Sequence, residues 1–160
     1  MSSLRRAFQG TAGALAVGAV LGAVSCARGP TPPAALDTKN DACASCRMGV
    51  VDRRFAAQLV APGEEPLFFD DIGCLRDYLA RLPRLPEGAM AYVSDHRTQS
   101  WVAASTAVYT RAPRARTPMD SGLIAHADLA SRDQDEAARG GSPLTATDVF
   151  GLRGAPGATK

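Results

Sequence analysis

The sequence predicts an α+β protein in which two small β-β-α-β units pack together behind an N-terminal lipoprotein signal peptide and a Pro-rich tether. Three observations predict this. The chain has 160 residues, of which 46% are hydrophobic and 21% charged, which is typical of a globular domain. Residues 1–25 combine two arginines with a small, apolar stretch, as export signals do. Between residues 42 and 150, strand-like and helix-like segments follow one another in the same order twice.

The N-terminal segment predicts export and lipidation. Arg5 and Arg6 precede an apolar stretch over residues 11–24, which is too short to span a bilayer core of roughly 30 Å. Ser25 and Cys26 follow, and a small residue directly before such a cysteine resembles a bacterial lipobox, where the thiol is lipidated after cleavage. We therefore expect a lipoprotein on the periplasmic side of a bacterial membrane. The outer membrane is favoured because no Asp follows the cysteine; the alternative is an ordinary signal peptide with an incidental cysteine.

Composition divides the rest of the chain into four segments. Residues 26–41 contain three prolines and no apolar periodicity, which predicts a lipid attachment site followed by a flexible tether. Residues 42–95 and 96–150 form the two predicted units. Residues 151–160 are rich in glycine and predict a disordered tail.

The first unit begins with strand-like segments at residues 55–60 and 66–69. Asp70 and Asp71 come next, where their carboxylates suit the free N–H groups of a helix N-terminus. An apolar stripe with helical spacing then runs until two prolines stop it. The last strand is expected at residues 90–94.

The second unit repeats this order. Strands are expected at residues 101–110 and 122–127. Residues 131–134 form a capping box that opens a short helix, and a glycine pair closes it. Residues 143–150 supply the last predicted strand. Because units of about fifty residues are marginally stable alone, we expect the two to share a core.

Sulfur-bearing side chains carry the predicted chemistry. Cys43, Cys46 and Met48 lie within six residues of one another. Cys74 falls in the first turn of the predicted helix, and Met119 lies in a polar Pro-Met-Asp-Ser-Gly turn, although methionine usually fills cores. Thiolate and thioether ligands select Cu(I) over hard cations. The sequence therefore predicts a Cu(I) site and, since no catalytic constellation is recognisable, no enzymatic activity.

Two alternatives use the same cysteines. Cys43 and Cys46 could serve a periplasmic thiol-disulfide oxidoreductase, or these two with Cys74 and a histidine could hold a structural zinc. A thioredoxin-like motif opens a helix after a strand, whereas this motif follows a tether and precedes a strand. The order of the segments therefore favours a metal carrier.

Five short motifs in this order resemble the NosL family of copper-binding lipoproteins, the accessory proteins of nitrous oxide reductase. They are Cys43-x-x-Cys46-x-Met48, the stretch FDDIGCL at 69–75, YVSD at 92–95, WVxA at 101–104, and TPMxxG at 117–122. The resemblance implies two related β-β-α-β units and a periplasmic chaperone that passes Cu(I) to the reductase and its assembly machinery, in denitrification. Arg47 and Asp120 stand where many members have glycine, and His126 where members usually have an aromatic residue.

The remaining candidates rank lower. His126 is expected to be structural or to add an imidazole ligand, and His96 is expected to be a solvated loop residue; both are lower-ranked metal candidates. A nucleic-acid partner is not expected. The formal net charge of +2 comes entirely from Arg5 and Arg6, because the rest of the chain balances 16 positive against 16 negative side chains.

Overall fold

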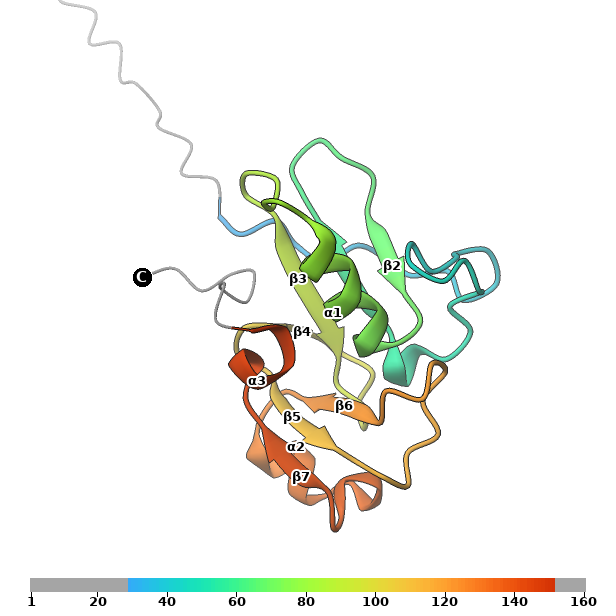
Figure 1. Ribbon diagram of the computed structural model, residues 1–160, viewed down its shortest axis with the longest axis vertical. Helices are drawn as coiled ribbons and strands as arrows, with labels where there is room; N and C mark the ends of the chain where they lie inside the picture. Colours follow the sequence, from blue (N-terminus) through green and yellow to red (C-terminus); the bar gives the residue numbers. More distant parts are fainter. Residues whose placement is uncertain (1–28, 152–160) are drawn as a thin grey trace, which may run out of the picture.

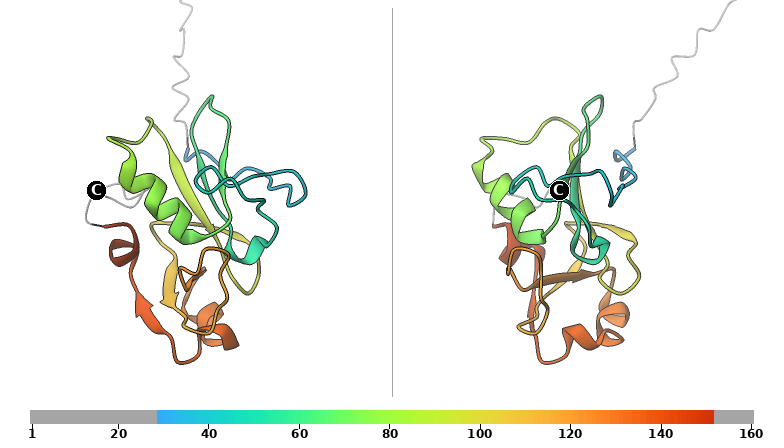
Figure 2. Two further views of the ribbon diagram at one scale, coloured as in Figure 1. Left: turned by 45° about the vertical axis from the view of Figure 1, so that its right-hand side comes forward. Right: turned by 90° about the vertical axis from the view of Figure 1, so that its right-hand side faces the viewer.

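Figure 1 shows the computed structural model, which describes residues 29–151. The signal peptide, the predicted lipidation site Cys26 and the tail over residues 152–160 lie outside the described residues. Two antiparallel sheets lie one above the other along the long axis of the described part, and the helices cover them on the outside (Figures 1 and 2). Within residues 29–151 no helix has the length and apolar character needed to cross a membrane.

The first sheet has four antiparallel strands in the order β2-β1-β3-β4. The short 3-10 helix η1 (Arg53–Phe55) leads into it. The strands are β1 (Ala57–Val60), β2 (Leu67–Phe69), β3 (Met90–Ser94) and β4 (Trp101–Ala103). The central strand β1 is buried along its whole length, and α1 (Ile72–Arg81) packs beside it (Figure 1). The predicted strands at 66–69 and 90–94 are confirmed.

Helix α1 begins where the sequence predicts. The Asp71 carboxylate caps it by accepting the Gly73 N–H at 2.6 Å, and the chain leaves helical geometry at Leu82, just before the first proline. Ile72 and Leu75 are fully buried against the sheet. A strong cap and an apolar stripe thus fix the first turn of α1, which matters because this turn also carries Cys74.

The second sheet repeats the connectivity of the first. Its strand order is β6-β5-β7, which corresponds to β2-β1-β3, and in both cases a helix lies between the second and third strands in the sequence. The elements are β5 (Val108–Arg111), β6 (Leu123–His126), α2 (Leu129–Asp133), the 3-10 helix η2 (Glu136–Ala138), β7 (Ser142–Leu144) and α3 (Ala146–Phe150). The α+β class and the repeated β-β-α-β order are therefore confirmed.

Three local predictions in the second unit are wrong. The strand predicted at 101–110 is two strands, because a turn after β4 sends the chain into the other sheet. The helix predicted to open at 131–134 instead begins at Leu129, since the Asp128 side chain caps it. The strand predicted at 143–150 ends at Leu144, because Thr145 and Asp148 form a capping box that starts α3.

The described part of the predicted tether is not free. The Gln58 side chain accepts the Ala34 N–H at 2.7 Å and donates to the Ala34 carbonyl at 3.2 Å. The Tyr92 hydroxyl donates to the Thr31 carbonyl at 2.7 Å. Residues 31–36 therefore lie on the first sheet, and the prediction of a flexible tether is wrong for this stretch. Sequence patterning missed this docking because the contacts join residues far apart in the chain.

A buried carboxylate joins the two sheets. Asp95 follows β3, is fully buried, and accepts the N–H groups of Arg97, Thr98 and Ala127 and the Ser131 hydroxyl. Burial alone would favour the neutral acid, but the hydrogen bonds from Ala127, Thr98 and Ser131 hold the pKa of Asp95 at about 2. Since Ala127 and Ser131 belong to the second unit, a charged Asp95 stabilises the contact between the units.

Candidate metal centre

Three thiols and one carboxylate come together at one edge of the first unit. One ligand atom from each of Cys43, Cys46, Asp70 and Cys74 lies within 4.8 Å of all the others. Cys43, Asp70 and Cys74 are buried, and Cys46 is partly exposed. All three cysteines are free thiols. This cysteine cluster draws on three segments: a tight turn before η1, the end of β2, and the first turn of α1.

A tight turn sets the first two thiols. The Cys43 N–H donates to the Met48 carbonyl at 2.7 Å and the Cys43 carbonyl accepts the Arg47 N–H at 3.0 Å, which closes the turn. The Cys46 N–H points at the Cys43 sulfur at 3.5 Å, and a bridge between Cys43 and Phe68 fixes the turn to β2. Arg47 has a φ of 68°, in the left-handed region that glycine adopts most easily. The two sulfurs are therefore held on one side of a strained turn.

Asp70 faces the cysteines rather than capping α1. The Cys46 thiol donates to both Asp70 carboxylate oxygens at 3.4 Å, and Asp70 is 2% exposed. The prediction that both Asp70 and Asp71 cap the helix is therefore right for Asp71 and wrong for Asp70. Asp70 follows β2 and lies four residues before Cys74, which is in the first turn of α1. The two side chains therefore reach the same cluster.

The surroundings favour the protonated form of the Cys46 and Cys74 thiols, because they raise the pKa of both. Burial raises the pKa of the Cys46 thiol, and the neighbouring Cys43 and Asp70 raise it further. Burial also raises the pKa of the Cys74 thiol far above its ordinary value, with additional contributions from Cys43 and Asp70. A metal ion reverses this preference, because its positive charge stabilises thiolates. The cluster is thus suited to exchanging protons for a soft cation.

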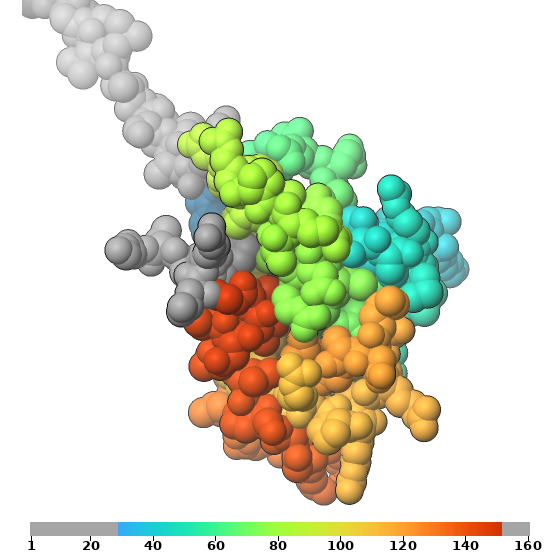
Figure 3. All heavy atoms as spheres, in the orientation of Figure 1, coloured from blue at the N-terminus to red at the C-terminus, as the bar shows by residue number. Residues whose placement is uncertain are grey.

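The loop that carries Met119 lies on the first turn of α1. The Met119 N–H donates to Asp71 Oδ2 at 3.0 Å, while the other oxygen of the same carboxylate caps the helix. A Cβ on Gly73 would meet the Ser121 Cβ at 2.8 Å, so the loop and the helix are in close contact. Figure 3 shows this orange loop, the green helix and the cyan N-terminal turn meeting on one face of the molecule.

Neither Met48 nor Met119 is a core residue. Their exposed fractions are 46% and 44%, so burial gives no reason for a methionine at either position. Each methionine adjoins a residue with positive φ: Arg47 at 68° and Asp120 at 56°. The backbone of Met48 is bonded to Cys43, and that of Met119 to the cap of the helix bearing Cys74.

The two histidines lie in a different group. His96 and His126 form a buried cluster with Asp135 and share no residue with the cysteine cluster. His96 is 8% exposed, so the prediction that it is a solvated loop residue is wrong. Its ring packs against Phe55 and contacts Asp135, which lie 41 and 39 residues away in the sequence.

Sequence reasoning missed two carboxylates. Asp70 and Asp135 each complete a group of potential ligands, but neither was assigned to a site from the sequence. A carboxylate next to a helix start has a simpler explanation as a cap, and only tertiary structure shows which partner it faces. For Asp70, the one available signal is its i, i+4 spacing to Cys74 across the helix start.

Comparison with known proteins gives one match. The family model described as NosL matches residues 33–151, which includes every described residue of the cysteine cluster and the Met119 loop. No curated protein matches the chain, and no solved structure matches it.

Proposed function

Since the chain belongs to the NosL family, we propose that it is a membrane-anchored periplasmic Cu(I) carrier that delivers copper to a cuproenzyme, nitrous oxide reductase being the favoured acceptor. The observation that carries the proposal is the convergence of three free thiols within 4.8 Å of one another. A carrier must hold its ion and also release it, and both properties follow from this cluster.

The donor atoms favour a soft ion. Thiolates select Cu(I), and thioethers add to this preference because they are poor ligands for zinc. Cys43, Cys46 and Cys74 supply the thiolates in the proposal, and the half-exposed Met48 and Met119 supply thioethers at the open side. A site that is buried on one side and open on the other can pass its ion to a second set of sulfur ligands.

A thiol-disulfide enzyme fits the site less well. Such enzymes need a cysteine whose pKa is lowered, usually at a helix N-terminus. Cys43 and Cys46 lie in a turn, and burial raises the pKa of the Cys46 thiol. Both observations support a ligand role over a nucleophilic one.

Structural zinc is the stronger competitor, because three thiols and Asp70 supply four ligands. The experiment that separates the two is an anaerobic competition titration of the full chain with Cu(I) and with Zn²⁺ against chelators of known affinity. The proposal predicts one Cu(I) per chain at the cysteine cluster, and that Cu(I) displaces zinc from it. Displacement of Cu(I) by an equal amount of Zn²⁺ would favour the structural zinc function.

Met119→Leu is expected to weaken Cu(I) binding at least tenfold, roughly 1.4 kcal/mol. The substitution nearly preserves volume, and the half-exposed side chain makes a stability loss above ~1.5 kcal/mol unexpected. Zinc affinity at the cysteines should hardly change. The measurement is a Cu(I) chelator competition, with Met90→Leu in β3 as the matched control. Equal Cu(I) affinity in wild type and folded Met119→Leu protein would remove this thioether from the site.

Oxidation is expected to abolish Cu(I) binding reversibly. A disulfide between Cys43 and Cys46 would consume two donors, since thiolates are the ligating form. The protein should lose its copper capacity after treatment with a thiol oxidant and regain it after reduction, as measured by bound copper per chain. The same copper stoichiometry in both states would contradict the role of these two cysteines.

Cys26→Ser is expected to release the protein from membranes or leave an uncleaved precursor. The motivation is the Ser25–Cys26 pair at the end of the apolar stretch, since several acyl chains make a stable anchor. Membrane fractionation of the native host checks this. Wild-type protein found wholly in the soluble fraction and without lipid would overturn the proposed anchor.

A further inference from the structure

A second group of metal-ligand side chains lies in the second unit. His96, His126 and Asp135 each place one nitrogen or oxygen atom within 4.8 Å of the others. Their exposed fractions are 8%, 0% and 9%. This group contains no sulfur ligand and shares no residue with the cysteine cluster. Its two buried imidazoles and buried carboxylate therefore call for a separate explanation.

Both imidazoles point at one oxygen atom. His96 Nδ1 lies 2.5 Å and His126 Nε2 lies 3.0 Å from Asp135 Oδ2. The other oxygen, Oδ1, accepts the Ala137 N–H at 2.9 Å, which fixes the orientation of the carboxylate. Metal ligands are typically oriented by such outer contacts. The three ligand atoms therefore converge, and the backbone holds the carboxylate in place.

Rigid elements carry the two rings. His126 is the last residue of β6, and the His96 N–H donates to the Ala125 carbonyl at 2.8 Å. The Phe55 ring packs against His96 with centroids 5.2 Å apart. Among the described residues, His126 Nδ1 is buried without a hydrogen-bond partner. Of the two ring nitrogens of His126, only Nε2 makes a hydrogen bond within the described residues, and its partner is Asp135.

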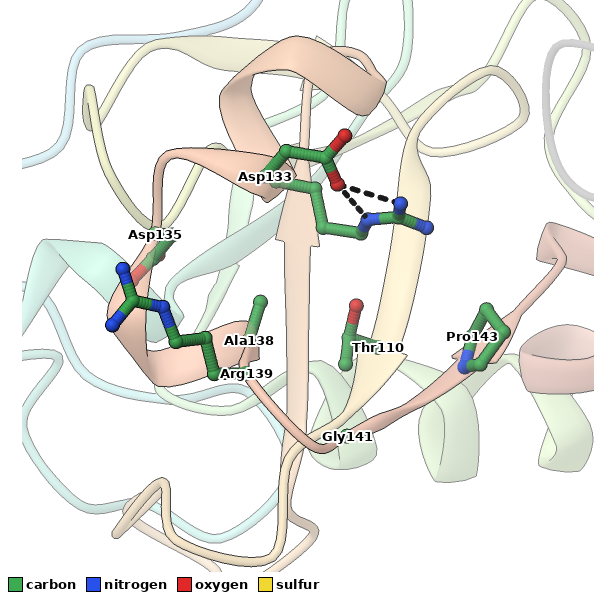
Figure 4. Close-up of a pocket in the computed structure, with 8 residues that line it drawn as sticks. Thr110, Asp133, Asp135, Ala138, Arg139, Gly141 and Pro143 are labelled. Atoms are coloured by element: carbon green, nitrogen blue, oxygen red, sulfur yellow. Dashed lines mark hydrogen bonds and ion pairs between the residues drawn. The ribbon is translucent and has the colours of Figure 1, made fainter.

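One residue of the group, Asp135, borders the surface. Asp135 lies at the edge of an open hollow of about 460 Å³ that Thr110, Asp133, Arg139 and Gly141 also line (Figure 4). Each of the two arginines of this hollow lies beside a carboxylate that offsets part of its charge: Arg132 beside Asp133 at 2.6 Å, and Arg139 beside Glu136 at 3.5 Å.

We propose that His96, His126 and Asp135 form a second metal site that takes a borderline divalent cation of the Zn²⁺ type. Two imidazoles and a carboxylate suit such ions, and the absence of sulfur from this set removes the preference for Cu(I). Neutral imidazoles need lose no proton on binding, since the proton moves to the other ring nitrogen. For His126 that nitrogen is Nδ1, which is buried without a hydrogen-bond partner. Its N–H would stay unpaired in the metal-bound state, which lowers the affinity of the site for the ion and makes the ion exchangeable. The site does not depend on which ion the cysteine cluster holds.

The test needs the cysteine cluster silenced, because thiols also bind zinc. The full chain carrying Cys43→Ser, Cys46→Ser and Cys74→Ser is titrated with Zn²⁺ in the presence of a weak chelator, after thermal unfolding has shown that it folds. We expect one Zn²⁺ per chain and a rise in the unfolding temperature with zinc. A Co²⁺ titration of wild type provides a second readout. Cobalt in the cysteine cluster gives an intense thiolate charge-transfer band, and we expect one further equivalent per chain that binds without adding to this band.

Two amide substitutions separate a metal site from a structural hydrogen-bond cluster. In His96→Asn and His126→Gln the amide nitrogen replaces the imidazole nitrogen that faces Asp135, so the hydrogen bond is retained while a metal ligand is lost. We expect each to weaken zinc binding by at least about 100-fold in the chain with the three serine substitutions, and to leave Cu(I) stoichiometry unchanged in the wild-type background. Asp77→Asn, a substitution at an exposed position on α1, is the matched control and should bind zinc as before.

Two results would overturn the proposal. One is a folded chain with the three serine substitutions that takes up no stoichiometric Zn²⁺. The other is undiminished zinc binding in both amide variants, which would show that the ion lies elsewhere. Loss of Cu(I) binding by wild type would contradict the proposed copper function but leave this site untouched, so the two failures are distinguishable.

Discussion

Cys46→Ser is expected to lower Cu(I) affinity by at least about 100-fold, roughly 2.7 kcal/mol. The substitution removes one thiolate from the cysteine cluster and leaves a hydroxyl that can still donate to Asp70, whose oxygens lie 3.4 Å from the Cys46 sulfur. Because Cys46 is only partly buried, the free energy of unfolding should change by less than about 1 kcal/mol. The affinity is measured by anaerobic competition with a Cu(I) chelator.

Ser45→Ala is the matched control for this prediction. Ser45 adjoins Cys46, and its hydroxyl accepts a hydrogen bond from Arg81 at 3.0 Å, so the variant perturbs the same turn without touching a sulfur. We expect its Cu(I) affinity to equal that of wild type. If Cys46→Ser and Ser45→Ala both bind as tightly as wild type, copper does not use the Cys46 thiol.

Asp95→Asn is expected to destabilise the fold by ~3 kcal/mol. The lowering of the Asp95 pKa from 3.8 to about 2 corresponds to about 2 kcal/mol of stability at neutral pH. In Asn an NH₂ group, which donates, replaces one of the two oxygens that accept hydrogen bonds. The groups that donate to that oxygen in wild type would then face another donor, and buried N–H groups would be left unpaired. Chemical denaturation at pH 7 measures the loss, with Asp133→Asn at an exposed position as the control, expected within about 0.5 kcal/mol of wild type.

The same carboxylate predicts a pH dependence with a definite sign. The pKa of Asp95 is lower in the folded protein than in the unfolded chain, so its contribution is fully present above about pH 4 and is lost as the pH falls through about 2. The stability difference between wild type and Asp95→Asn should therefore shrink between pH 4 and pH 2. A difference that stays constant over this range would show that the charge of Asp95 contributes nothing.

Local signals predicted the first unit well. The Asp71 cap, the apolar stripe of α1 and the following prolines are all short-range features, and the structure agrees with them. The second unit was harder to predict because residues 101–110 are rich in small residues that fit a strand or a turn equally well. The break between β4 and β5 becomes visible only when β4 pairs with β3 and β5 with β6.

The candidate sites divide in the same way. Sulfur chemistry singled out Cys43 and Cys46 from the sequence, and it ranked Cys74 lower because a single cysteine in a helix is also explained as a buried thiol. The structure brings the three thiols together. Asp70 and Asp135 were not predicted, because Cys46 lies 24 residues from Asp70, and His96 lies 39 residues from Asp135. A carboxylate acquires its role from whatever tertiary structure brings to it, and no local pattern encodes that.

X-ray absorption at the copper edge of the anaerobically Cu(I)-loaded full chain identifies the atoms that bind copper. If the cysteine cluster holds Cu(I), we expect a first shell dominated by sulfur from Cys43, Cys46 and Cys74 with a methionine thioether, and a clear loss of sulfur scattering in the Cys46→Ser protein. A first shell made only of nitrogen and oxygen, or one unchanged by Cys46→Ser, would contradict this expectation.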